Sequence, residues 1–107
     1  MFLEKYLSEL YIELLYDSYD ENYINSLDEN NFLKIYQVFK KYNFYFIEDI
    51  VLKYLEIFEQ DPIIIEQKIN KLREKLGDDY VKIIGNNMIY LEELYFETKK
   101  RPQITLQ

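Results

Sequence analysis

The stretch Asp61–Gly77, DPIIIEQKINKLREKLG, decides the fold, because it contains a complete helix with both of its end signals. Asp61 is a favourable N-cap, and Pro62 suits the first helical position, where its missing N–H costs nothing. Gly77 readily adopts the left-handed conformation that follows many helices. An apolar stripe with helical spacing lies between these ends, formed by Ile65, Ile69, Leu72 and Leu76. The stretch predicts one amphipathic helix that packs against other helices.

Similar signals on both sides of this stretch predict an all-α fold without strands. The expected caps are Ser26 (with Glu29 in a capping box), Asp78 or Asp79, and Asn86 or Asn87, and the expected stops are Asn43 and Gly85. These signals place helices at about 2–19, 27–42, 47–59, 62–76, 79–84 and 87–98. We therefore expect a single domain over residues 1–98, a compact bundle or short stack of about five to six helices, and a flexible tail at 99–107.

The residue types that are absent exclude several classes of function. The 107 residues include no His and no Cys, which removes disulfides, imidazole and thiolate chemistry and the usual zinc sites. The only glycines are Gly77 and Gly85, so no Gly-rich phosphate loop is present. We expect no enzyme, no cofactor and no metal site. The N-terminus resembles no signal peptide and no apolar run could span a membrane, so we expect a cytoplasmic protein.

An internal repeat is a second interpretation of the pattern. A shift of 34 residues places Ile35 on Ile69, Asn43 on Gly77 and Ile50 on Ile84, which predicts two helical pairs stacked as a short solenoid. Two amphipathic helices in so apolar a chain can also align without a repeat. About residues 35–94 resemble helical repeats of the mitochondrial transcription termination factor type, and the matching positions are Pro62, Leu72, Leu76-Gly77 and Ile84. This resemblance implies a stack of paired helices that binds nucleic acid along a basic concave face.

The net charge of −7 arises entirely within the first 31 residues, where eight acidic side chains face Lys5 alone. In the predicted first helix, Leu3, Leu7, Leu10 and Leu14 form the stripe that we expect to face the core. The carboxylates of Glu9, Glu13, Asp17 and Asp20 follow one flank, and Ile12, Tyr16 and Tyr19 lie on the side away from the leucines. Carboxylates in a row can imitate phosphates, and tyrosines are common at binding hot spots. A solvated helix face that only aids solubility is the alternative.

The favoured hypothesis is a non-catalytic interaction module, an inhibitor or nucleic-acid mimic. It would dock on a basic surface of a nucleic-acid-handling protein through Glu9, Glu13, Tyr16, Asp17, Tyr19 and Asp20. The chain is similar in character, though not in sequence, to small acidic phage proteins of the anti-CRISPR or anti-restriction kind. Its residue usage is typical of AT-rich codons, which indicates a low-GC bacterium or its phage.

Two other functions remain open at this point. A nucleic-acid binder of the termination-factor type would need a basic face built from Lys34, Lys40, Lys41, Lys68, Lys71, Arg73, Lys75 and Lys82. Because these lysines and arginines are not in excess over acids, we do not expect direct nucleic-acid binding. A self-associating scaffold, such as a homodimer, is the other alternative.

Overall fold

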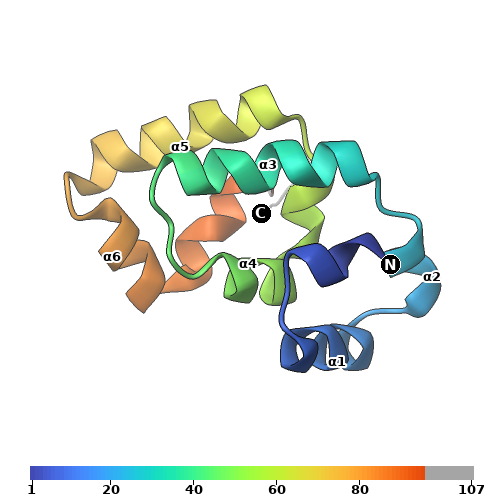
Figure 1. The fold of residues 1–107 in the computed structure, drawn as a ribbon. Helices are drawn as coiled ribbons and strands as arrows, with labels where there is room; N and C mark the ends of the chain where they lie inside the picture. Colours follow the sequence, from blue (N-terminus) through green and yellow to red (C-terminus); the bar gives the residue numbers. More distant parts are fainter. Residues whose placement is uncertain (96–107) are drawn as a thin grey trace, which may run out of the picture.

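Helices α3 (Glu29–Lys41) and α5 (Pro62–Leu76) pack side by side and form one layer of the molecule (Figure 1). The structure, a computed structural model, describes residues 1–95, and every regular element in that range is a helix. Besides α3 and α5, these elements are η1 (Phe2–Lys5), α1 (Glu9–Ser18), α2 (Glu21–Asn25), α4 (Ile47–Lys53), η2 (Leu55–Glu59), α6 (Tyr80–Asn86) and η3 (Met88–Leu94), where η denotes a 3₁₀ helix. The expected all-α fold is confirmed.

The helix from Pro62 to Leu76 is confirmed with both of its end signals. The Asp61 carboxylate accepts a hydrogen bond from the backbone N–H of Ile63 at 2.8 Å. Gly77 follows the helix with a φ of 87°, and Asn43, which follows α3, has a φ of 65°. Both residues therefore have a positive φ, which glycine and asparagine tolerate better than other residue types.

Several expected boundaries are wrong. Asp28, rather than Ser26, caps α3, because its carboxylate accepts from the N–H of Asn31 while the Ser26 hydroxyl donates to the Tyr23 carbonyl. The helix expected at 47–59 is divided at Tyr54, which has a φ of −137°. Gly85 lies within α6 instead of ending it. A Cβ at Gly85 would lie 3.0 Å from the Phe46 ring, so the glycine permits close packing.

The order of elements recurs along the chain. An α-helix, a second α-helix and a 3₁₀ helix occur as α3, α4 and η2, and again as α5, α6 and η3. Each element of the second set begins 33 residues after its counterpart. The last helix expected at 87–98 is described as η3 up to Leu94, and the tail expected at 99–107 lies outside the described residues.

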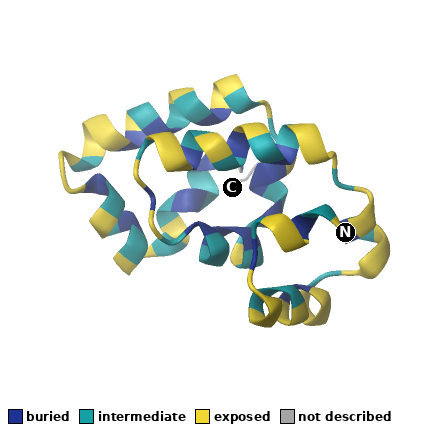
Figure 2. Ribbon diagram, in the orientation of Figure 1, coloured by how far each residue is buried: buried dark blue, intermediate teal, exposed yellow. Residues whose placement is uncertain are grey.

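The core lies where the facing sides of the helices meet, and it combines many aliphatic side chains with a cluster of aromatic rings (Figure 2). The Phe32 and Phe58 rings stack with their centroids 4.7 Å apart, and Phe39 lies 5.8 Å from Phe58. All three side chains are buried, and each contributes roughly 1.5–3 kcal/mol relative to an exposed position. Asn31 adds polar contacts at the edge of this core, donating to the carbonyls of Phe58 and Gln60 at 2.9 Å each.

The single helix expected at 2–19 is wrong, and this difference determines the orientation of α1. The chain is interrupted at Ser8, which has an extended conformation and whose N–H donates to a Glu48 carboxylate oxygen at 2.8 Å. The Tyr11 hydroxyl donates to Asp49 at 2.7 Å. Both acceptors lie in the first turn of α4, against which α1 packs. In a continuous helix the Ser8 N–H would donate to a backbone carbonyl one turn earlier. Here it donates to Glu48 of α4 instead, and α1 begins at the next residue.

Candidate protein-interaction face

The face that α1 presents to solvent is not the one that the leucine stripe predicts. Leu3 and Leu7 are buried, but Leu10 is 60% exposed and Leu14 is 38% exposed. Leu15 is buried in their place, and Tyr11 and Ile12 pack against the core beside it. The expected burial of Leu10 and Leu14 is therefore wrong, because the interruption at Ser8 lets α1 rotate relative to the preceding turn.

Three of the predicted carboxylates form a ladder on the outward face of α1. Glu9, Glu13 and Asp17 are all exposed, and successive members are four residues apart, about 40° around the helix axis. Among residues 1–95, no hydrogen bond or ion pair involves these three carboxylates. We call Glu9, Glu13 and Asp17 the acidic ladder.

Other acids of the N-terminal segment already have structural partners. Glu29 pairs with Lys5 at 3.3 Å, and Glu4 lies 3.8 Å from the N-terminal ammonium group. Asp20 and Asp28 cap α2 and α3, each accepting from a backbone N–H. Within the described residues, the acids of this segment that neither form an ion pair nor cap a helix are Glu21 in α2 and the three acids of the ladder on α1.

The two predicted tyrosines have different positions. Tyr16 is 38% exposed, its hydroxyl lies 3.9 Å from the Met1 sulfur, and at about 100° per residue it lies beside Glu9 on the helix surface. Tyr19 is half-buried instead, and its hydroxyl accepts a hydrogen bond from the Leu55 N–H at 3.3 Å. Burial raises the pKa of Tyr19 above its ordinary value. Tyr19 therefore connects the end of α1 to η2, and Asp20 is the N-cap of α2. Both residues have structural roles next to the acidic ladder.

Leu10 and Leu14 are exposed apolar residues that the sequence reasoning assigned to the core. At about 100° per residue they lie directly beside Asp17, on the side of the ladder opposite Tyr16. A signal for them was present, because Ser8 followed by Glu9 is a typical helix start. From that start, Tyr11, Leu15 and Tyr19 form a second stripe with helical spacing.

The eight basic residues that a nucleic-acid face would need are distributed over α3, α5 and α6. Lys41 is paired with Glu66 at 2.7 Å, and Lys75 is paired with Glu93 at 3.1 Å. The Lys41 ammonium and the Tyr42 hydroxyl both hydrogen-bond the Glu66 carboxylate and hold its pKa below the ordinary value. Lys41 and Lys75 are thus each paired with a carboxylate, and Lys68 donates to the Leu94 carbonyl.

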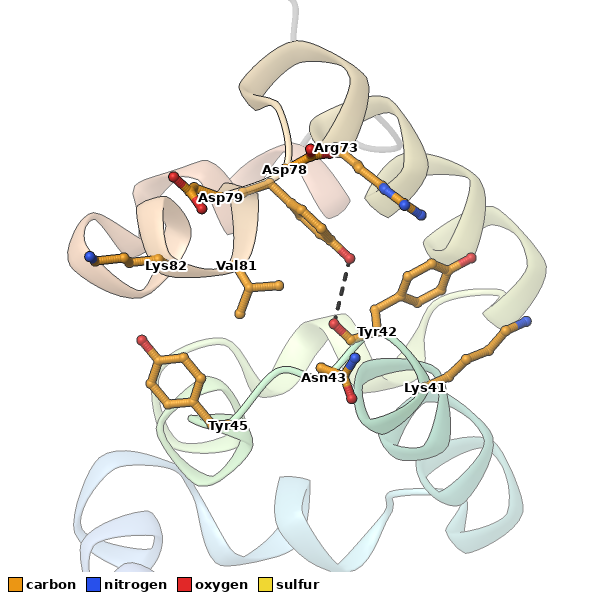
Figure 3. Close-up of a pocket in the computed structure, with 10 residues that line it drawn as sticks. Lys41, Tyr42, Asn43, Tyr45, Arg73, Asp78, Asp79, Val81 and Lys82 are labelled. Carbon is orange, nitrogen blue, oxygen red and sulfur yellow. Dashed lines mark hydrogen bonds between the residues drawn. The ribbon is translucent and has the colours of Figure 1, made fainter.

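A pocket of about 680 Å³ lies between the loop that follows α3 and the loop that follows α5 (Figure 3). Lys82 and Asp79 lie on one side of its opening, and Lys41 and Arg73 on the other. The Tyr80 hydroxyl donates across it to the Tyr42 carbonyl at 3.5 Å. Cations and carboxylates are mixed around this rim, so its charges favour no single class of ligand.

No set of three or more acidic side chains in residues 1–95 is arranged to hold a metal ion. No helix in that range has both the length and the apolar character needed to cross a membrane. Comparison with protein-family models, with curated proteins and with solved structures finds no match for this chain.

Proposed function

We propose that this protein is a non-catalytic interaction module that docks through α1 on a basic surface of a nucleic-acid-handling protein. One observation supports this most strongly. The acidic ladder is exposed and unpaired within the described residues, and it is bordered by exposed apolar side chains, Leu10 and Leu14 on one side and Tyr16 on the other. A binding surface commonly combines apolar anchors with charges that match the partner.

The cost of the acidic ladder to the helix supports the same proposal. Like charges four residues apart destabilise a helix by roughly 0.2–0.5 kcal/mol per pair, and α1 has no lysine that relieves them. Asp17 also lies in the last turn, where the helix dipole disfavours a negative charge. Because this arrangement opposes helix stability, a binding role explains it better than solubility alone. A cationic partner would attract all three carboxylates and offset their mutual repulsion.

The experiment is capture of proteins from the host extract on the immobilised wild-type chain and on the double variant Glu13→Lys/Asp17→Lys. The matched control is Glu74→Lys/Asp78→Lys, which has the same net charge but alters exposed residues outside α1. We expect the wild type and the control to retain a nucleic-acid-binding protein that added duplex DNA displaces, and the α1 variant to lose it. Circular dichroism should show equal helicity for all three.

Two results would contradict the proposal. The first is capture that the α1 variant leaves undiminished, or that duplex DNA does not displace. The second is direct binding of duplex DNA by the isolated wild-type chain at low salt, which would instead favour the helical-repeat nucleic-acid binder. The recurring order of α3, α4, η2 and α5, α6, η3 is the observation that keeps this second candidate under test.

A further inference from the structure

The charge of the described chain is divided between two layers of helices. Helix α1 contains three acidic residues and no basic one. Helices α3 and α5 together contain seven basic and three acidic residues. The packing order runs from α1 through α4 and α3 to α5, so the acidic and basic helices lie on opposite sides of the molecule (Figure 1).

The basic layer contains a groove with an apolar wall. This groove, of about 290 Å³, lies between α3 and the first turn of α5, and its apolar lining residues are Val38, Pro62 and Ile63. Ile63, the second residue of α5, is 67% exposed. Lys34 also lines the groove, as do Lys41 and Glu66, which pair with each other; no carboxylate among residues 1–95 pairs with Lys34.

We propose that this groove is the docking site for α1 of a second copy of the chain. Leu10 and Leu14, one helical turn apart, supply an apolar pair that fits against Ile63 and Val38. Glu13 lies between them along the helix and brings its carboxylate toward Lys34. The charge complementarity between α1 and the α3–α5 layer favours this occupant, because each surface is the oppositely charged counterpart of the other.

The geometry determines the kind of assembly. The docking helix and the groove are different surfaces on opposite sides of one molecule, so two copies cannot satisfy both contacts reciprocally. Such a heterologous contact adds copies head to tail, and the mean size of the assembly increases with concentration. Because the contact includes ion pairs near the surface, it weakens as salt is added.

The test is the mass of the full chain by sedimentation velocity, over a series of concentrations. We expect the wild type to exceed the mass of one chain at an ionic strength of about 0.01 M and to return to it at about 1 M, where the Debye length has fallen from about 30 Å to about 3 Å. Two variants disable the two surfaces separately. Leu10→Ser/Glu13→Gln alters the docking helix, and Lys34→Gln/Ile63→Ser alters the groove.

Each variant alone should remain at the mass of one chain, while their equimolar mixture should reach two chains and no more. This result follows because the mixture contains one intact helix and one intact groove that can meet. The matched control, Lys71→Gln/Ile89→Ser, removes one exposed lysine and one exposed isoleucine away from the groove and should assemble as the wild type does. All of these substitutions are at exposed positions, and circular dichroism verifies folding.

Three results would overturn the proposal: a wild type that stays at one chain at every concentration in low salt, assembly that either variant retains, or a mixture that does not combine. The inference does not rest on the function proposed above, although both use α1. The Lys34→Gln/Ile63→Ser variant leaves α1 intact, so capture of a basic partner should persist when self-association is lost. Failure of one proposal is therefore distinguishable from failure of the other.

Discussion

Replacing Glu13 by glutamine should stabilise the fold, because Glu13 occupies the centre of the acidic ladder. It lies four residues from both Glu9 and Asp17, so the change removes two like-charge pairs at once. At roughly 0.2–0.5 kcal/mol per pair, the free energy of unfolding should increase by about 0.4–1 kcal/mol at low salt. The loss of native contacts should be negligible, since the described residues provide none to the Glu13 carboxylate.

The assay is urea unfolding followed by far-ultraviolet circular dichroism. The midpoint should move to higher urea with an unchanged slope, because the surface exposed on unfolding stays the same. The gain should vanish at an ionic strength of about 1 M, where charges on neighbouring helical turns are screened. Glu74→Gln is the matched control, because the same substitution on α5 removes a carboxylate whose neighbour three residues earlier is Lys71. That variant should show no gain.

A lower midpoint for Glu13→Gln would refute the reasoning, since it would mean that the carboxylate stabilises the native state. A gain that persists unchanged in high salt would also refute it, because the effect would then not be electrostatic. The expected result would show that the acidic ladder is maintained at a cost to stability, which is typical of functional surfaces.

Two further predictions concern the core. Asn31→Ala should lower the free energy of unfolding by about 1–3 kcal/mol in urea titration, because the carbonyls of Phe58 and Gln60 both lose the Asn31 amide donor. The control Asn30→Ala, at an exposed neighbouring position, should leave the free energy of unfolding nearly unchanged. Stability should also fall as the pH rises from about 10 to about 12, since unfolded tyrosines ionise near their ordinary pKa of about 10. In the folded state burial raises the pKa of Tyr19 and Tyr54, and raises that of Tyr95 to about 12. A urea midpoint that does not change over this range would contradict this assignment.

The accuracy of the sequence interpretation differs between helix ends and helix faces. The end signals at Asp61, Asn43 and Gly77 were interpreted correctly, because a cap or a left-handed stop depends on atoms within about four residues of itself. The capping box at Ser26 was wrong although the motif is present, since Asp28 supplies the cap two residues later and begins the helix there. The sequence alone does not show which of two neighbouring capping residues, Ser26 or Asp28, begins the helix.

The face of α1 shows what local signals leave open. Leu3, Leu7, Leu10 and Leu14 have helical spacing, but only the first two are buried. The other two are exposed because Glu48 binds the Ser8 N–H from 40 residues away in the sequence. No pattern within α1 contains that interaction. Two stripes with helical spacing are therefore available to α1, and the position of α4 decides that Leu10 and Leu14 reach solvent.

The sequence by itself determined the helical class, the ends of α5 and the concentration of charge at the N-terminus, since these depend on composition and on neighbours along the chain. The tertiary structure decided which charges remain unpaired and which apolar side chains reach solvent. It paired Lys5 with Glu29 and Lys41 with Glu66, and it left the acidic ladder free among the described residues. The physical reason is that burial and ion pairing depend on distances between helices, which the packing of the core sets.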